Sequence, residues 1–288
     1  INMISPTEEE IQRVCAALQI KQDFIRYSLD EEEKARIDTE DDDNTTLYII
    51  DIPVIESDRT RRVYVTMPIG VIFVRDDYII TVSQKNNDII KDIKTENVIT
   101  YKKSRFLLQI LYANSKKFLS LLYKINKELE STENKLKNSL QNEGLLKMLD
   151  LEKSLVYFTT SLKSNEVVME KTTRGKIIKL YEEDEDLLED AIIENKQAIE
   201  MAKIYSDILS GTMDTYASII SNNLNAVMKI LTSVTFILAI PTLIASIWGM
   251  NVELPFQREP LGFLIITVFS IIMCIVATIW LKRKRMLN

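Results

Sequence analysis

The stretch that decides the fold is residues 230–248, which read ILTSVTFILAIPTLIASIW. These nineteen residues carry no charge, and a helix of about 20 residues crosses the roughly 30 Å hydrocarbon core of a bilayer. Residues 261–281, LGFLIITVFSIIMCIVATIWL, form a second uncharged run. Two buried helices of a soluble protein are the alternative, but such helices usually carry a polar stripe, and we expect none in the second run. Two membrane spans are therefore predicted, at about 230–248 and 261–281.

Charge is distributed unevenly along the chain. Residues 230–288 carry five basic and two acidic side chains, a net charge of +3, and the whole chain carries −6, so residues 1–229 carry −9. An acidic region of this kind is not expected to bind nucleic acid, which requires basic patches, but it can attract cations. The basic cluster 282–285 after the second span is expected on the cytoplasmic side of the inner (plasma) membrane. Because two spans return the chain to its starting side, both termini are expected in the cytoplasm.

The chain lacks the residue types that many metal sites and enzymes use. It has no histidine, so the imidazole ligands of zinc, nickel and copper and the commonest general base are absent. Oxygen ligands suited to hard cations remain. Cys15 and Cys274 lie far apart in the sequence, and no disulfide is expected between them. Without a nucleophile–base pairing or a glycine-rich phosphate motif, the chain is not predicted to be an enzyme.

The part before the spans is predicted to contain an α/β domain at 1–100 and a helical and stalk region at 101–229, followed by the membrane region at 230–288. β-branched and aromatic runs predict strands at 46–52, 61–67, 71–75 and 78–83, and a start signal predicts a helix from Thr7 to Leu18. Residues 28–44 are too charged for a core. Scarce proline and glycine favour long helices at about 105–141, 145–171 and 176 onward. The first of these is expected to carry one continuous apolar seam, at steps of three, four or seven: Leu111, Phe118, Leu122, Ile125, Leu129, Leu136 and Leu140. The predicted fold class is α+β.

The last of these helices has no evident stop before the membrane. Residues from about 181 to 247 are therefore predicted to form one helical rod roughly 100 Å long. Its cytoplasmic part alternates apolar and acidic residues, and self-association around an axis would bury the apolar seam. A homo-oligomer is inferred. The acidic runs at 40–43 and 182–186 are interpreted as solvated charge.

One face of this helix carries small or oxygen-bearing side chains. They recur at spacings of three and four: Asn225, Met228, Thr232, Thr235, Ala239, Thr242 and Ser246. The flanking positions, such as Phe236 and Leu243, are large and apolar. Several copies could place the oxygen-bearing stripe around an axis and the aliphatic side chains in lipid. The alternative is that small residues merely allow close helix packing.

The sequence Trp248-Gly249-Met250-Asn251 closes the first span. A Gly-Met-Asn motif at the outer end of the first of two C-terminal spans resembles the signature of CorA-type magnesium channels. Residues 209–216, 221–232 and 241–245 also resemble that family. The resemblance implies a homopentameric funnel in which a stalk helix becomes the pore-lining span. Two departures are Trp248, where Tyr or Phe is more usual, and the outer loop 252–256, which lacks the common Met-Pro-Glu-Leu wording.

The resemblance also implies roles for individual residues. Gly249 and Asn251 would form the outer ion-binding ring, with Thr242 below it. The pore and selectivity set is then Gly249, Met250, Asn251, Thr242, Ser246, Ala239, Thr235 and Thr232. Met228 and Leu231 would be the hydrophobic gate, with Asn225 at its inner mouth. Asp214 matches a position of the family's magnesium sensor between subunits, with Asp30 as a less secure partner.

These observations predict a homo-oligomeric divalent-cation channel for magnesium uptake, closed by cytoplasmic Mg²⁺. Magnesium sheds water reluctantly, so neutral amide oxygens at Asn251 could hold the hydrated ion; a helix C-cap beside Gly249 is the structural alternative for this residue. At about 2.3 kcal/mol per charge per 100 mV, an inward-moving divalent ion gains roughly 4.6 kcal/mol. The alternatives are a related transporter for zinc, cobalt or nickel and a non-conducting membrane-tethered scaffold or sensor.

Overall fold

The chain divides into two compact units in the computed structural model. The structure describes residues 1–40, 44–57, 62–75, 77–95, 102–138, 142–175, 177–178, 181–252 and 261–286. The first unit comprises Ile1–Met213 and the second Asp214–Asn288. One helix, α6 (Glu182–Trp248), contributes residues to both. The units are described separately below.

A five-stranded sheet forms the centre of the first unit, in the order β1-β5-β4-β3-β2. Its strands are β1 (Asn2–Ile4), β2 (Arg36–Glu40), β3 (Thr45–Ser57), β4 (Arg62–Val74) and β5 (Tyr78–Ser83). β1 is parallel to β5, and all other neighbours are antiparallel. The charged segment 28–44 supplies β2 at one edge of the sheet, where side chains can reach water. The segment therefore forms a strand that its charge alone did not suggest.

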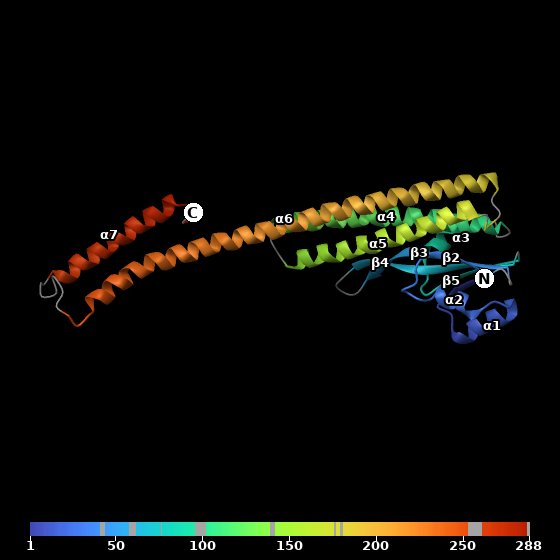
Figure 1. The fold of residues 1–288 in the computed structure, drawn as a ribbon, viewed down its shortest axis with the longest axis horizontal. Coiled ribbons are helices and arrows are strands. Elements are labelled where there is room, and N and C mark those ends of the chain that lie inside the picture. The colour runs from blue at the N-terminus through green and yellow to red at the C-terminus, as the bar shows by residue number, and fades with distance from the viewer. Residues whose placement is uncertain are drawn as a thin grey trace. The chain divides into compact units, whose positions relative to one another are not determined.

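Helices cover both faces of this sheet (Figure 1). α1 (Glu8–Leu18) and α2 (Gln22–Tyr27) pack on one face, and α3 (Asp88–Thr95), α4 (Lys103–Asn138) and α5 (Asn142–Gly175) pack on the other. Successive residues of β3 enter the two cores alternately: Leu47 packs with α1 and α2, and Tyr48 packs with the longer helices. Because side chains alternate along a strand, a strand covered on both faces is apolar at nearly every position.

The helices begin and end close to where the sequence predicts. Thr7 caps α1: its side chain accepts a hydrogen bond from the Glu10 amide, and its own amide donates to Glu10 Oε2 at 2.9 Å. The expected helical seam of α4 is buried at Leu111, Phe118, Leu122, Ile125, Leu129 and Leu136; Leu140 lies outside the described residues. The predicted rod at about 181–247 is confirmed as one continuous helix, α6.

The acidic run at the start of α6 is not simply solvated charge. Asp184 is 2% exposed, and its Oδ1 lies 3.4 Å from Nη1 of Arg105 on α4. Its other oxygen accepts a hydrogen bond from the Tyr181 amide at 3.4 Å, which satisfies one of the amides that a helix start leaves without a partner. Asp184 therefore caps the start of α6 and ties the helix to α4. Of the run at 40–43, only Glu40 lies within the described residues, and its carboxylate pairs with Lys21.

β4 is one strand, although the sequence predicted a break between 67 and 71. Pro68 pairs with Asp51 of β3, but the Asp51 amide donates instead to Asn165 of α5. On the other side, the ladder between β4 and β5 ends at Ile69 and Ser83. The missing N–H of Pro68 therefore costs no ladder bond, which is the position where a strand tolerates proline.

A buried polar network joins the sheet to α4 and α5 at Asp51. The β2–β3 ladder ends at Arg36 and Ile49. Beyond this end, two side-chain amides from α4 and α5 form hydrogen bonds with the backbone of Asp51. Asn165 accepts from the Asp51 amide at 2.9 Å and donates to its carbonyl at 2.8 Å, while Asn114 donates to the same carbonyl at 2.9 Å. Burial raises the pKa of the Asp51 carboxyl to about 6, and a hydrogen bond with Ser161 opposes part of that shift.

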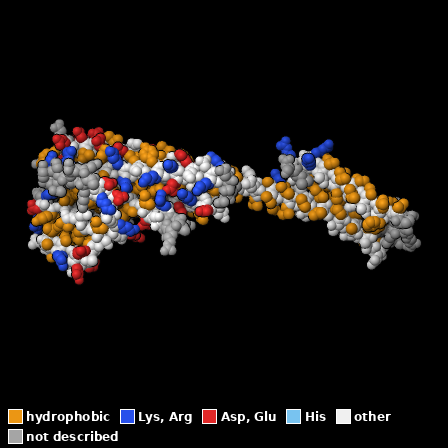
Figure 2. Space-filling view, turned by 180° about the vertical axis from the view of Figure 1, so that it is seen from behind, with side chains coloured by type: hydrophobic (Ala, Val, Ile, Leu, Met, Phe, Trp, Pro, Cys, Tyr) orange, Lys and Arg blue, Asp and Glu red, His pale blue; other side chains and the backbone are white. Residues whose placement is uncertain are grey.

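The second unit contains the rest of α6 and α7 (Gly262–Arg283). Both helices are long and apolar enough to cross a membrane, and only 6% and 11% of their most apolar windows are buried. A core helix of a soluble protein would be mostly buried, so this alternative is not supported. Figure 2 shows hydrophobic side chains over the visible face of these spans, while acidic side chains gather on the first unit.

Replacing Asp51 with Asn should remove a pH dependence of stability. The pKa of Asp51 is raised in the folded state, to about 6, so the folded protein binds the proton of this carboxyl more tightly than the unfolded chain does. The resulting stabilisation is lost as pH rises through the folded pKa. From pH 5 to pH 7 the loss is about 1 kcal/mol. Asp51→Asn keeps the backbone bonds and should flatten this part of the profile. The measurement is the unfolding free energy of the full chain in detergent, followed by near-ultraviolet circular dichroism; parallel profiles for both proteins would contradict the assignment.

Candidate functional site

All seven stripe positions of α6 are exposed in the single chain: Asn225, Met228, Thr232, Thr235, Ala239, Thr242 and Ser246. Four of them line one hollow of about 720 Å³, namely Thr235, Ala239, Thr242 and Ser246. Asn225, Met228 and Thr232 line another, of about 560 Å³, together with Lys229 and Arg285. The single chain therefore leaves the whole stripe uncovered and groups its members in two neighbouring sets along the helix.

The second span packs against a different face of α6. Ser233 is fully buried, and its hydroxyl donates to the Met286 carbonyl at 3.2 Å. Further along α6, Ile244 and Trp248 line a groove with α7, while Ile237 and Ile240 are half-buried. At 3.6 residues per turn, the mean direction of these five positions differs from that of the stripe by roughly 150°. α7 thus covers the side of α6 that lies almost opposite the stripe.

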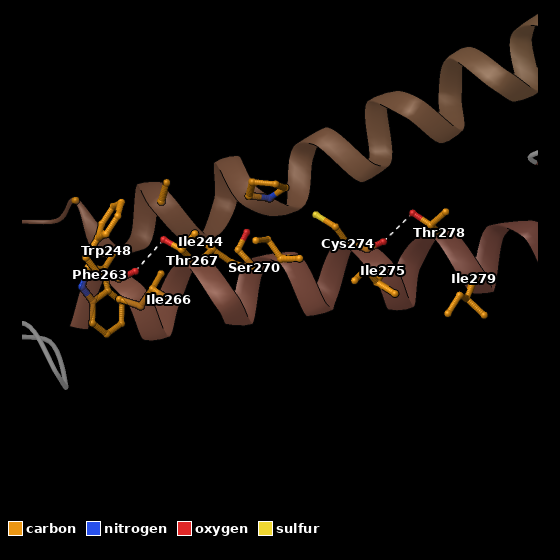
Figure 3. Close-up of a pocket in the computed structure, with 14 residues that line it drawn as sticks. Ile244, Trp248, Phe263, Ile266, Thr267, Ser270, Cys274, Ile275, Thr278 and Ile279 are labelled. Carbon is orange, nitrogen blue, oxygen red and sulfur yellow. Dashed lines mark hydrogen bonds between the residues drawn. The ribbon is translucent and has the colours of Figure 1, made fainter. Parts of the chain in front are cut away.

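The groove between the two spans has a volume of about 950 Å³. On α7 it is lined by a polar stripe: Thr267, Ser270, Cys274 and Thr278 (Figure 3). We expected no polar stripe on this span, so that expectation was wrong. The spacings of three and four residues were visible in the sequence, and small polar side chains of this kind let two helices approach closely in a membrane.

Two threonine hydroxyls of the α6 stripe donate their protons to backbone carbonyls of the preceding helical turn. Thr235 Oγ1 donates to the Leu231 carbonyl at 2.9 Å, and Thr242 Oγ1 donates to the Leu238 carbonyl at 2.9 Å. Such bonds to the preceding turn are common for threonine within helices. The hydroxyl oxygen keeps lone pairs that can accept a further hydrogen bond. Each of these threonines therefore presents an acceptor along the exposed stripe.

The Gly-Met-Asn segment continues directly from the end of α6. The Gly249 amide donates to the Ala245 carbonyl at 2.9 Å, and the Met250 amide donates to Ile247 at 3.3 Å. Neither Gly249 nor Asn251 has a positive φ, so neither residue adopts the left-handed conformation that many helix C-caps use. A Cβ at position 249 would meet only the Ala245 and Ser246 carbonyl oxygens, at 3.3 and 3.8 Å. The outer loop from residue 253 to 260 lies outside the described residues.

The two candidate regulatory carboxylates belong to different units. Asp214 is exposed on α6 at the start of the second unit. Asp30 is exposed after α2 in the first unit, where Oδ1 accepts from the Glu32 amide at 3.0 Å. Among the described residues, no group of three or more acidic or cysteine side chains could hold a metal ion. A metal bound by these two residues would therefore need ligands from another subunit or from water.

Comparison with known proteins identifies the family. Residues 1–283 match the family described as CorA-like Mg²⁺ transporter protein. The chain is a member of this family. A cobalt/magnesium transport protein CorA of Methanocaldococcus jannaschii is 30% identical over 295 residues, which cover 99% of this chain and 90% of that protein. The protein of the same name from Thermotoga maritima is 32% identical over 148 residues, covering 47% of this chain and 42% of the relative.

The fold agrees with this assignment. The complete structure of the CorA magnesium transporter from M. jannaschii matches with a TM-score of 0.83 and 28% identity, over 98% of this chain and 89% of that one. The predicted α+β class, with an N-terminal α/β domain, a long helix and two C-terminal apolar helices, is confirmed. CorA-like proteins are membrane ion transporters, so the expectation that the chain is not an enzyme is confirmed as well.

Cysteines placed on the two faces of α6 should differ in their reaction with a water-soluble, cationic thiol reagent. In a background with Cys15→Ser and Cys274→Ser, Thr235→Cys and Thr242→Cys should react, because we expect the uncovered oxygen-bearing stripe to face water. Ile244→Cys, on the face toward α7, is the control and should stay unmodified. The measurement is the extent of labelling in membranes, read by mass spectrometry. Equal protection of all three cysteines would show that the stripe does not meet water.

Proposed function

We propose that this chain assembles into a homopentameric channel that mediates magnesium uptake across the inner (plasma) membrane, with both termini in the cytoplasm. The observation that carries the proposal is the division of faces on α6: α7 covers one side, and the oxygen-bearing stripe on the nearly opposite side is left uncovered. Self-association would bring the stripes of several copies around a common axis. The relatives named cobalt/magnesium transport proteins support a divalent cation as cargo.

The lining chemistry fits a cation that keeps its water. Magnesium loses its first-shell water reluctantly, and the protons of that water point outward. Thr235 and Thr242 can accept hydrogen bonds from such protons, because their own protons are bonded to the preceding helical turn. Asn251 would add an amide oxygen at the outer mouth, with Gly249 beside it adding no side chain. A hydrated ion can then pass along neutral acceptors without binding too tightly to leave.

Near the inner end of the stripe, Met228 is apolar and Leu231 lies beside the stripe; the two side chains are 50% and 56% exposed in a single chain. Rings of these side chains around an axis would form a hydrophobic constriction, which can close a pore by excluding water. Asn225 would lie at its cytoplasmic mouth. The membrane potential supplies the driving force, roughly 4.6 kcal/mol for a divalent ion at 100 mV.

Closure by cytoplasmic magnesium would use Asp214, with Asp30 as a second candidate ligand. Both carboxylates are exposed in one subunit, and the region before the spans carries a net charge of −9 against a total of −6. Magnesium bound between neighbouring subunits would offset the repulsion between acidic surfaces and favour the closed arrangement. Loss of the ion would release that restraint.

Asn251→Ala should abolish growth rescue of a magnesium-uptake-deficient cell, because it removes the amide oxygens of the outer ring. Asn223→Ala, on α6 and turned about 180° from the stripe residue Thr232, is the matched control and should rescue growth normally. In liposomes, Asn251→Ala should lower magnesium flux about tenfold, equivalent to about 1.4 kcal/mol. Flux of zinc in place of magnesium through the unmodified protein would support the zinc-transporter alternative. A protein that carries no divalent ion would support the scaffold alternative.

Asp214→Ala should raise the cytoplasmic magnesium concentration needed to stop uptake, because each subunit loses one sensor carboxylate. A shift of about tenfold corresponds to about 1.4 kcal/mol of lost binding free energy. Asp207→Ala removes an equivalent charge two turns earlier on α6 and is the control for general electrostatics. Flux is measured in liposomes with magnesium varied on the side that corresponds to the cytoplasm. Inhibition that is identical in the unmodified protein and in Asp214→Ala would remove Asp214 from the sensor.

A further inference from the structure

Pro241 interrupts the hydrogen bonding of α6 within the membrane span. Proline has no backbone N–H, so the carbonyl four residues earlier loses its regular helical donor. That carbonyl belongs to Ile237, which lies between the stripe positions Thr235 and Ala239. In hydrocarbon no water is available to replace the missing donor, and neighbouring helices usually provide one.

The replacement donor comes from α7. The Cys274 thiol lies 3.7 Å from the Ile237 carbonyl oxygen and is oriented to donate to it. Figure 3 shows the Cys274 side chain directed toward α6 from the middle of α7. Within α7, the Cys274 carbonyl accepts a hydrogen bond from Thr278 Oγ1 at 2.8 Å. A carbonyl deprived of its donor and a thiol on the neighbouring helix therefore meet at one place.

We propose that Cys274 is a positioning residue for the ion pathway. Its thiol replaces the helical hydrogen bond that Pro241 removes and couples α7 to α6 at the level of Ala239 and Thr242. The second half of this proposal rests on the proposed function, since it assumes that the stripe lines the pathway. With this hydrogen bond in place, α6 is stabilised at Pro241, where its own backbone hydrogen bonding is interrupted. Without it, α6 can bend at Pro241 and displace the Thr242 hydroxyl.

The hydrogen bond can be tested without measuring transport. Cys15→Ser leaves Cys274 as the only thiol, because the chain has two cysteines. The S–H stretch lies in an infrared window free of other protein bands and shifts to lower frequency when the thiol donates a hydrogen bond. The full-length protein in lipid should show the shifted band. Adding Pro241→Ala, which restores the backbone donor at 241, should move the band back toward the frequency of an unbonded thiol. An unshifted band in the Cys15→Ser protein would overturn the proposal.

The effect on transport is tested by three substitutions of Cys274. Cys274→Ser keeps a donor and should retain magnesium flux in liposomes. Cys274→Ala and Cys274→Val remove the donor, the second while keeping volume, and both should lower flux about two- to fivefold, the factor that a weak hydrogen bond of this kind is worth. Full flux in the Val variant would limit the role of Cys274 to packing, as would equal losses in the Ser and Ala variants.

A double-substitution cycle separates the two parts of the proposal. In a Pro241→Ala background, Cys274→Ala should change flux less than it does in the unmodified protein, because the carbonyl then has its own helical donor. Equal effects in both backgrounds would show that Cys274 does not act through Pro241. If the unmodified protein carries no magnesium, the proposed function fails, while the infrared band still decides whether the thiol bonds the carbonyl.

Discussion

The structure of the second unit depends on one constraint: inside a membrane, the protein itself must supply partners for its backbone polar groups. Helices meet this demand through their own hydrogen bonds, and α6 meets it except where Pro241 removes a donor. The second span supplies what is missing through Cys274. A second bond, from Ser233 on α6 to the Met286 carbonyl, ties the segment that follows α7 to α6. The two spans are thus joined by hydrogen bonds from one helix's side chains to the other's backbone as well as by apolar packing.

This pairing determines which surface of α6 remains for other copies. Because α7 packs along the line of Ser233, Ile244 and Trp248, the threonine-containing stripe faces nearly the opposite way. Large apolar side chains lie on the flanks. A helix with three different faces of this kind is suited to touch a partner span, lipid and a shared axis at once. The first unit uses α6 differently, burying Leu188 and Ala191 against α4, α5 and the sheet.

Much of the fold could be predicted from the sequence because local patterns specify it. Uncharged runs predict the spans, the apolar seam of α4 predicts its buried face, and Gly249-Met250-Asn251 marks the end of α6. The stripe was also readable, since its spacing follows the helical period. The break expected in β4 was wrong because the tolerance for Pro68 depends on where two neighbouring ladders end. The polar stripe of α7 is present in the sequence, but the larger apolar residues between its members obscure it.

Other features could not be predicted, because their partners lie far away along the chain. Asn165 bonds a backbone 114 residues earlier, and Arg105 reaches Asp184 across 79 residues. A missing donor at Ile237 follows directly from Pro241, but that Cys274 supplies the replacement depends on how α7 is aligned along α6. The roles of Asp30, Asp214 and Asn251 stay predictions, since they concern ions and contacts between subunits.

The threonine hydroxyls have one further consequence, for the sign of the charge that the stripe can accept. A hydroxyl whose proton is bonded to its own helix, as in Thr235 and Thr242, can only accept. Water around a dissolved cation directs both of its protons outward, whereas water around an anion such as chloride directs one proton toward the ion and so has only one left to donate. An uncharged row of acceptors of this kind therefore offers more hydrogen bonds to a hydrated cation than to a hydrated anion, without an acidic side chain in the stripe.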